Sequence, residues 1–311
     1  MAPDRIVVVG AGVVGLSCAL RLLQAGHRVD VLARDLPLET TSSVAAAIWY
    51  PYLAFPQDKV TAWGKAAYDE FVRLAGEGAD GVMVRRGTEL LRRPTPNPWW
   101  IDAIPTLDRV PPRAPYADAW SFETPVIDMS RYLSWLADRV RDAGGTITRM
   151  ALGSLPEAPL VVNCSGLGSR RLAADETTTP VRGQVVVVEQ FGLEHWWLAE
   201  GVAGDVPTYV IPRTHDIVLG GTDEEGDWSR TPVPATAEAI LERTTDLVPE
   251  LAGARILRHK VGLRPARPQV RLERVGDVIH CYGHGGAGVT LSWGCADEVA
   301  GLADTSVGRL P

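Results

Sequence analysis

Along the chain, runs of consecutive apolar residues predict buried strands, and apolar residues at helical spacing predict the amphipathic helices that follow them. Residues 6–9 are four β-branched apolar residues in a row, which is typical of a strand buried on both faces. After a glycine-rich turn, Leu16, Leu20 and Leu23 recur at helical spacing, and residues 28–32 form the next strand-like run. The order strand, glycine turn, helix and strand predicts the first crossover of a parallel α/β sheet.

The rest of the chain continues this alternation, with a proline-rich and irregular section between about residues 94 and 125. Helical periodicity predicts further helices near residues 56–80, 128–144, 235–248 and 288–303. The alanine-rich residues 44–47, preceded by hydroxyl side chains, also favour a helix. Strands are expected at residues 81–85, 146–149, 160–166, 184–189, 208–211, 217–220 and 278–282.

These elements predict an α/β protein whose first domain is assembled from separate pieces of the chain. A Rossmann-like dinucleotide-binding domain with a parallel sheet is expected from residues 1–50, 137–183 and 262–311. The other residues, 51–136 and 184–261, are expected to form an inserted α+β substrate-binding domain with a large mixed or antiparallel sheet.

Composition and charge narrow the classes of partner. The 311 residues carry a formal net charge of −7 and contain no basic run, which argues against nucleic acid or an anionic membrane as a partner. No apolar stretch is long enough to span a bilayer and the N-terminus has no signal-peptide pattern, so we expect a cytoplasmic protein. The four cysteines form no CxxC pair and the six histidines show no ligand spacing. Buried thiols are therefore expected, and a metal site is not.

Three glycines in the first turn have the spacing of a dinucleotide-binding fingerprint. Gly10 permits the turn, Gly12 lets the backbone approach a pyrophosphate, and Gly15 lets the helix pack against the strand. The helix N-terminus then offers free N–H groups to the anion. This turn is the strongest indication of a nucleotide cofactor.

Two sites downstream of this turn are open to more than one interpretation. Asp35 could bind a ribose hydroxyl, Arg34 could instead bind the 2′-phosphate of NADP, or both could be solvated charges. The hydroxyls of residues 40–43 either cap a helix or donate to phosphate, and capping is the simpler interpretation.

Candidate chemistry gathers in two segments near the C-terminus. In residues 262–268, prolines restrict the backbone around Arg264, which suits a guanidinium that must meet a carboxylate through two parallel hydrogen bonds. Arg267, by contrast, is expected to be a structural ion-pair partner. The glycine-rich helix start at residues 285–290 can place N–H groups against a developing negative charge, and His284 is expected to anchor this turn, not to act as a base.

Four stretches resemble the FAD-dependent D-amino-acid oxidases, a family that includes D-aspartate oxidase. They are residues 10–17, residues 45–53 around a Trp-x-Pro-Tyr sequence, residues 262–272, and residues 282–294 with a Gly-His-Gly-Gly turn. Weaker similarity at residues 162–166, 209–212 and 219–228 extends the resemblance over nearly the whole chain. The resemblance implies a flavoprotein oxidoreductase that binds FAD and, with O2, converts neutral D-amino acids into 2-oxo acids, ammonia and hydrogen peroxide.

The same resemblance implies which residues form the site. Tyr209, Arg264 and Gly286 would be catalytic, and together with Tyr50 they would contact the substrate, whose carboxylate Arg264 and Tyr209 would bind. The implied FAD contacts are Gly10, Gly12, Val13, Val14, Gly15, Arg34, Asp35, Thr40, Thr41, Ser42, Ala46, Trp49, Ser165, Gly166, Arg264, Gly285, Gly286, Gly288, Val289 and Thr290.

The chain also departs from that family. Tyr50 stands where mammalian members have glutamine, and Arg34-Asp35 reverses their usual order of acid and arginine. The loop near residues 202–208 is shorter and lacks their tyrosine, which favours an open entrance. The final residues do not have the SKL-type peroxisomal address, in keeping with a cytoplasmic protein.

Three other functions are kept as alternatives. A D-aspartate oxidase would need a second cation in the pocket, for which Arg213 is the candidate. A glycine or sarcosine oxidase is the second, and a non-catalytic nucleotide-binding protein is the third. The expected partners are a small D-amino acid and O2, and a homodimer is left open as the state of assembly.

Overall fold

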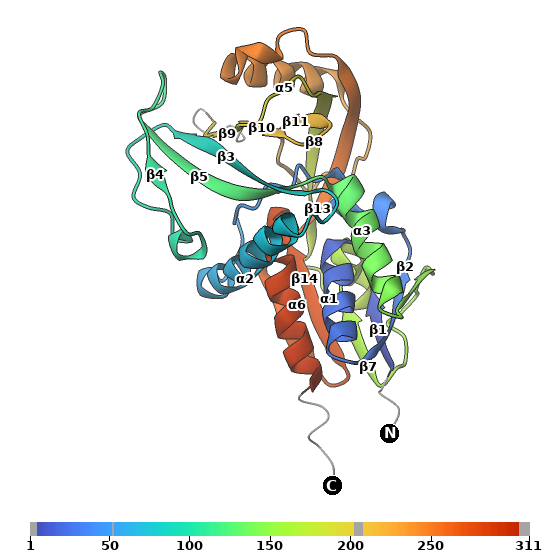
Figure 1. The fold of residues 1–311 in the computed structure, drawn as a ribbon. Helices are drawn as coiled ribbons and strands as arrows, with labels where there is room; N and C mark the ends of the chain where they lie inside the picture. Colours follow the sequence, from blue (N-terminus) through green and yellow to red (C-terminus); the bar gives the residue numbers. More distant parts are fainter. Residues whose placement is uncertain (1–4, 52, 202–207, 305–311) are drawn as a thin grey trace.

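One continuous mixed sheet runs through the molecule (Figure 1). The structure is a computed structural model that describes residues 5–51, 53–201 and 208–304. Within these residues, fourteen strands form the sheet, in the order β4-β5-β3-β9-β10-β11-β8-β13-β14-β7-β1-β2-β6, with β12 beside β8. The α/β fold class is therefore confirmed.

Parallel strands form one end of this sheet, as the first crossover predicts. β1 lies between β2 and β7, β14 extends the sheet beyond β7, and β6 extends it beyond β2, all in parallel. The helices α1, α3 and α6 pack beside one another on this part (Figure 1). The bounds are β1 Arg5–Val9, α1 Val13–Gln24, β2 Arg28–Ala33, α3 Met129–Asp142, β6 Thr146–Arg149, β7 Leu160–Asn163, α4 Ser169–Leu172, β14 Val278–His284 and α6 Gly288–Asp304.

Mostly antiparallel strands form the other end. β3 pairs with β5 in an antiparallel and with β9 in a parallel arrangement, and β9, β10 and β11 continue as an antiparallel meander. Helix α5 packs on β8, β10 and β11, and it closes a second hydrophobic core there. The bounds are α2 Gln57–Gly76, β3 Val82–Leu91, β4 Asp108–Arg109, β5 Asp118–Ile127, β9 Trp196–Ala199, β10 Thr208–Pro212, β11 Asp216–Gly220, β12 Glu224–Glu225 and α5 Pro234–Leu247.

Two long strands, β8 (Thr179–Glu189) and β13 (Ile256–Val275), join the two ends. β13 pairs with β8 over residues 256–266 and with β14 over residues 266–275, so a single strand belongs to both parts of the sheet. The predicted domain boundaries after residues 136, 183 and 261 fall inside α3, β8 and β13. The division into two domains remains a prediction.

The sequence pattern predicted four long helices correctly and the conformation of the alanine-rich segment wrongly. The helices expected near residues 56–80, 128–144, 235–248 and 288–303 are confirmed as α2, α3, α5 and α6. The helix expected over residues 44–47 is wrong, because a single helical turn, Thr41–Val44, ends there. The alanines instead follow an irregular course to β5, with Ala47 at φ +58°, and Ile127 donates its N–H to the carbonyl of Ala47 at 2.8 Å. Pairing with a strand therefore outweighs the helix propensity of alanine here.

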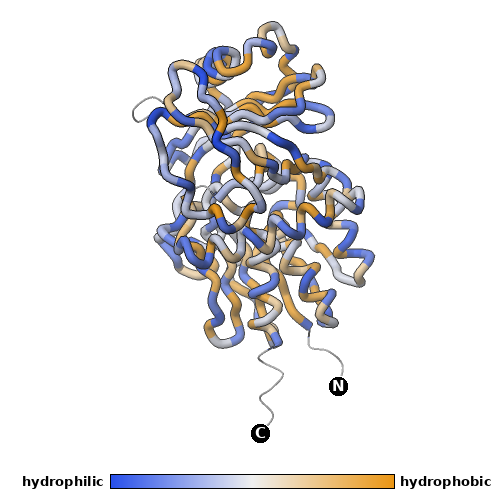
Figure 2. Tube along the Cα trace, turned by 60° about the vertical axis from the view of Figure 1, so that its left-hand side comes forward, coloured by the Kyte–Doolittle hydropathy of each residue, from blue (hydrophilic) through white to orange (hydrophobic). Residues whose placement is uncertain are grey.

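The hydrophobic cores follow the sheet and the inner faces of its helices. Figure 2 shows hydrophobic segments along the strands and hydrophilic residues on the outer turns. On α2, the residues that predicted the helix, Trp63, Ala67, Phe71 and Leu74, are all buried. No helix among the described residues has the length and apolarity needed to cross a membrane.

Helices α2 and α6 approach each other so closely that only glycine fits at the crossing. A Cβ atom at Gly294 would lie 2.4 Å from the Cα of Trp63, whereas a Cβ at Gly301 in the same helix would meet nothing within 4 Å. We expect Gly294→Ala to destabilise the protein by about 1–3 kcal/mol through overpacking. Gly301→Ala should instead stabilise it by up to about 1 kcal/mol, because alanine is the better helix former. Urea unfolding of both variants tests this, and equal or greater stability of Gly294→Ala would contradict the close approach.

Candidate functional site

A cavity of about 1070 Å³ extends from the carboxyl ends of β1, β7 and β14 to the face of β9 and β10. In an α/β sheet the carboxyl ends of parallel strands are where ligands bind. The cavity continues from there along β8 and β13 into the antiparallel part of the sheet. A long ligand at the parallel end and a small one at the antiparallel end would therefore share one space.

The first glycine turn brings backbone to the cavity wall. Gly10 has φ +113°, and a Cβ there would lie 2.4 Å from the carbonyl oxygen of Cys164. A Cβ on Gly15 would lie 2.0 Å from the carbonyl oxygen of Gly10, so the helix must pack directly on the turn. The first turn of α1 contains no acidic residue. Its dipole, and the N–H groups of this turn other than that of Val13, therefore remain available to a phosphate.

A hydroxyl far along the chain completes this helix start. The backbone N–H of Val13 donates to Oγ of Ser42 at 3.0 Å, and a Cβ on Gly12 would reach the same oxygen at 3.0 Å. The hydroxyls of residues 40–43 were expected to cap a helix of their own, but Ser42 caps α1 instead. Thr40, Thr41 and Ser42 all line the cavity beside the glycine turn.

Two further segments supply donors around the same space. Ser165 and Gly166 follow β7, and Oγ of Ser165 is buried without a hydrogen-bond partner among the described residues. The turn at residues 285–287 leads into α6, and Gly285, Gly286 and Gly288 line the cavity. An unsatisfied buried hydroxyl and two helix starts that face one cavity fit a bound dinucleotide.

Arg34 and Asp35 bind each other at the end of β2. Nη2 of Arg34 lies 2.6 Å from Oδ2 of Asp35, and this hydrogen bond holds the pKa of the carboxyl below its usual value. Both residues line the cavity. The ionised Asp35 is thus an acceptor at the position where a dinucleotide-binding fold places a ribose.

Arg264 and Tyr209 lie on a floor of glycines at the other end of the cavity. A Cβ on Gly183 would come within 2.5 Å of Nη2 of Arg264, and a Cβ on Gly220 within 2.1 Å of Cζ of Tyr209. Nη1 of Arg264 donates to the carbonyl of Thr222 at 2.9 Å. Burial raises the pKa of Tyr209 and the guanidinium partly offsets this, so the phenol stays protonated as a donor. The glycine floor was not recognised in the sequence, because Gly183 and Gly220 lie in strands that carry no glycine motif.

Glu89 is a site residue that the sequence analysis missed. It lies on β3, is only 8% exposed, and lines the cavity with Tyr50, whose hydroxyl donates to its Oε1 at 2.9 Å. Burial raises the pKa of Glu89 to about 7. The flanking sequence, Arg-Arg-Gly-Thr before it and Leu-Leu after it, gives no sign of its burial, which follows from the pairing of β3 with β5 and β9.

Most of the predicted site residues meet at the cavity. The residues that line it are Gly10, Gly12, Val13, Val14, Gly15, Arg34, Asp35, Thr40, Thr41, Ser42, Ala46, Tyr50, Ser165, Gly166, Tyr209, Arg264, Gly285, Gly286, Gly288 and Val289. Whether each contacts a ligand remains a prediction.

Two predicted cofactor contacts, Trp49 and Thr290, are not part of this lining. Trp49 is fully buried and donates from Nε1 to the carbonyl of Gly64 on α2 at 2.9 Å. The hydroxyl of Thr290 donates to the carbonyl of Tyr50 at 3.0 Å. These side chains hold the segment that carries Tyr50, so their link to the site is through the backbone of that segment.

Arg213, the candidate for the second cation that an acidic substrate would need, also lies outside the cavity lining. It is 2% exposed, and its guanidinium binds Asp216 at 2.6 Å and does not line the cavity. Arg267 is a structural ion-pair partner as expected, with Nε 2.9 Å from Oδ2 of Asp175. The loop expected to lack a lid tyrosine lies outside the described residues over 202–207, as does Tyr52.

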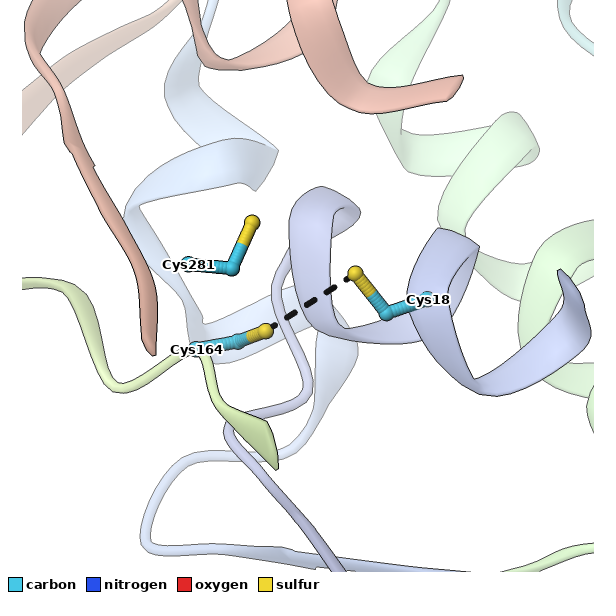
Figure 3. A group of neighbouring side chains, drawn as sticks. All are labelled: Cys18, Cys164 and Cys281. Carbon is cyan, nitrogen blue, oxygen red and sulfur yellow. Dashed lines mark hydrogen bonds between the residues drawn. The ribbon is translucent and has the colours of Figure 1, made fainter. Parts of the chain in front are cut away.

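The cysteines gather behind the glycine turn. Sγ atoms of Cys18, Cys164 and Cys281 lie within 4.8 Å of one another (Figure 3), and Cys281, His284 and Cys295 form a second such group. Three sulfur ligands suit a thiophilic metal ion. The same four cysteines are free thiols, three of them buried, and Cys164 is partly exposed at the cavity. As thiols they join α1, α6, β7 and β14 into one apolar core.

The chain belongs to the family of FAD dependent oxidoreductases, whose model matches residues 5–302. FAD is thus the cofactor on which the family depends, and the donors around the cavity fit it.

The names of similar proteins indicate which oxidoreductases of this family the chain resembles. A protein of Rubrobacter xylanophilus named D-amino-acid oxidase is 48% identical, with 97% of each chain covered. A protein of Homo sapiens named D-aspartate oxidase is 37% identical over 100% of this chain and 97% of its own. Among solved structures, glycine oxidase from Geobacillus kaustophilus superposes with a TM-score of 0.82 at 19% identity, covering 97% of this chain and 95% of that one. This last similarity concerns the fold.

The first glycine turn gives a test of the cofactor site. In Gly10→Ala, the new Cβ would meet the Cys164 carbonyl at a positive φ, so we expect the purified protein to lose most of its flavin. Gly26→Ala is the matched control, because Gly26 also has positive φ, +92°, but its Cβ would meet nothing within 4 Å. Flavin absorbance per protein chain is the measurement. Equal flavin content in the two variants would contradict the role of Gly10.

The thiol groups give a second test. The Sγ atoms of Cys18 and Cys164 are 3.9 Å apart, well beyond the length of a disulfide bond. We expect titration of the denatured protein, without reductant, to find four thiols per chain, and elemental analysis to find no stoichiometric metal. Two thiols or fewer, or one bound zinc or copper ion per chain, would contradict this.

Proposed function

We propose that the protein is an FAD-dependent oxidase of D-amino acids with uncharged side chains, which forms 2-oxo acids, ammonia and hydrogen peroxide. The observation that carries this is the pair Arg264 and Tyr209, fixed on a glycine floor in the cavity that the dinucleotide turns also line. A guanidinium and a phenol side by side form a carboxylate receptor. The relative of Rubrobacter xylanophilus named D-amino-acid oxidase supports the same function.

Binding begins with the substrate carboxylate. Arg264 has one side of its guanidinium directed to Thr222 and Asp223, at 2.9 and 3.6 Å from Nη1, which fixes its plane. The remaining donors can form a bidentate pair with a carboxylate, and Tyr209 can add a third hydrogen bond. The receptor is thus rigid before the substrate arrives, so little ordering entropy is lost on binding.

This anchoring orients the substrate for oxidation. FAD, when bound, would supply the acceptor for the hydride of the α-carbon, and O2 would afterwards take up the two electrons, together with the proton of that hydride and one from water, to give hydrogen peroxide. The α-amino group must be neutral as its lone pair forms the C=N bond, and water then hydrolyses the imino acid to a 2-oxo acid and ammonia. The chain's own contribution is positioning, together with the N–H groups of residues 285–289 that can stabilise negative charge.

The same anchoring explains chirality. With the carboxylate held by Arg264 and Tyr209 and the side chain in its pocket, only one enantiomer directs its α-hydrogen at the acceptor. The L-enantiomer, bound through the same carboxylate, would direct its hydrogen away. Stereochemistry therefore depends on three fixed points of contact.

The alternatives are less well supported. A D-aspartate oxidase is disfavoured because Arg213 is buried against Asp216 outside the cavity, and because the carboxylates of Glu89 and Glu200 lie on the side of the cavity that Tyr50 lines. A glycine or sarcosine oxidase would share the fold, and turnover of sarcosine would reveal it. A non-catalytic nucleotide-binding protein would leave the carboxylate receptor without a use. We further propose that the enzyme is cytoplasmic. The net charge of −7 supports the absence of nucleic-acid and membrane partners. Gel filtration would decide whether the protein is a homodimer.

Replacing the carboxylate anchor tests the function. Arg264→Ala removes a charge-assisted bidentate pair, which costs about 3 kcal/mol, so kcat/KM for D-methionine should fall about 100-fold. Arg267→Ala is the matched control, since Arg267 lies three residues further along the same strand but binds Asp175. It should lower the melting temperature and keep the preference for D-methionine over L-methionine. Peroxide formation is the measurement.

Two results would overturn the proposal. One is near-normal kcat/KM in Arg264→Ala. The other is peroxide formation from L-methionine as fast as from D-methionine in the unmodified, flavin-loaded protein.

A further inference from the structure

Glu89 stands in one row with the carboxylate receptor. On β3 it pairs with Leu198 of β9, and Leu198 pairs with Tyr209 of β10. Residues in register on neighbouring strands direct their side chains to the same face of a sheet. All three line the cavity, so Glu89 faces the space that begins at Tyr209.

The spacing of this row matches a long substrate side chain. Neighbouring strands lie about 4.8 Å apart, so the two steps from Tyr209 to Glu89 span about 10 Å. A substrate held by its carboxylate at Arg264 and Tyr209 would pass its side chain over Leu198 toward Glu89. An ammonium on a four-carbon stem, or a guanidinium, has the length to reach the carboxyl from there.

Glu89 is held in place and keeps one oxygen for a ligand. The Tyr50 hydroxyl donates to Oε1 at 2.9 Å, whereas Oε2 is buried and has no hydrogen-bond partner among the described residues. A buried acceptor without a partner costs free energy that a ligand donor would recover. A second carboxylate, that of Glu200, lines the cavity nearby and accepts from the backbone N–H of Arg92 at 2.9 Å.

We propose that Glu89 recognises positively charged side chains, so that D-amino acids ending in a guanidinium or an ammonium are preferred substrates of this oxidase. The proposal rests on the proposed function and extends its substrates from uncharged to positively charged side chains, which are preferred when the carboxyl is ionised. The same carboxyl repels acidic substrates. In its protonated form it is an uncharged wall that admits neutral side chains.

D-Arginine and D-citrulline form a matched pair for the test, because they have nearly the same shape and differ in charge. We expect kcat/KM of the unmodified, flavin-loaded protein at pH 8.5 to be at least 10-fold higher for D-arginine. In Glu89→Gln this ratio should fall by at least 10-fold. Glu194→Gln is the matched control, since Glu194 is exposed and binds Arg85 outside the cavity, and it should leave the ratio unchanged.

The dependence on pH gives a readout that requires no variant. Burial raises the pKa of Glu89 to about 7, so its carboxylate forms as the pH rises through that range. The ratio for D-arginine over D-citrulline should therefore rise from pH 6 to pH 8.5, and using a ratio cancels the common titration of the α-amino group. Tyr50 and Glu200 act directly on the Glu89 carboxyl. The other charged or titratable residues that line the same cavity are Arg34, Asp35, Cys164, Arg170, Arg171, Tyr209, Asp223, Arg230, Arg264, Cys281, Tyr282 and His284. The guanidinium of D-arginine stays charged over this range.

The possible results distinguish failure of the role of Glu89 from failure of the proposed function. A ratio near one that neither Glu89→Gln nor pH changes would overturn the role of Glu89 and leave the proposed function intact. If Glu89→Gln fails to fold, Tyr50→Phe, which removes the hydrogen bond to Oε1, should lower the ratio several-fold, and an unchanged ratio would overturn the role. Absence of peroxide with every D-amino acid would overturn the proposed function. The dissociation constants of D-arginine and D-citrulline, from the flavin absorbance of the loaded protein, would then still test Glu89.

Discussion

The contact between the Arg264 guanidinium and the bare backbone of Gly183 is the constraint on which the site depends. Arg264 lies on β13 and Gly183 on β8, the two strands that connect both ends of the sheet. A methyl group on Gly183 would come within 2.5 Å of the guanidinium and displace it. The position of Arg264, which we propose as the carboxylate anchor, is therefore set by sheet register, and so is its distance from the glycine turns.

At several places in the cavity wall, a turn or a side chain lies directly against the backbone of a glycine. Gly10 and Gly15 bring the first turn against Cys164 and against itself, and Gly220 gives room to Tyr209. Each of these glycines costs conformational entropy on folding and offers no side chain for the core. The chain accepts that cost at the places where a ligand or a catalytic side chain must lie directly on main chain. Elsewhere, large buried residues such as Trp49 and Trp293 fill the core.

The sequence was sufficient for the parts of the fold that depend on local pattern. Residues 6–32 predict their strand, turn, helix and strand because periodicity and glycine spacing are properties of consecutive residues. The course of residues 45–49 could not be predicted, since it results from hydrogen bonds with β5, about 80 residues away. The length of β13 was missed for the same reason. Its prolines interrupt the pattern, but pairing with β8 and β14 keeps the strand together.

The residues of the candidate site fall into the same two groups, those that the local sequence indicated and those that it did not. The glycine turns and Arg264 belong to segments whose order along the chain carries information, and the family resemblance located them. Ser42 as the cap of α1, Gly183 beneath Arg264 and Glu89 beside Tyr50 depend on residues that meet only in the folded sheet. A tertiary contact of this kind leaves no mark on the local sequence. A buried acid such as Glu89 needs a compensating environment, but its burial follows from strand pairing and not from the flanking sequence.

The continuity of β8 and β13 has a mechanical consequence. A protein whose two parts are joined by flexible linkers can admit a ligand by swinging them apart. Here such a rotation would have to break ladder hydrogen bonds between β8 and β13, in the strands that carry Gly183 and Arg264. Ligand exchange that leaves this ladder intact would proceed through displacements of loops around a fixed frame, and the distance between the glycine turns and Arg264 would stay the same.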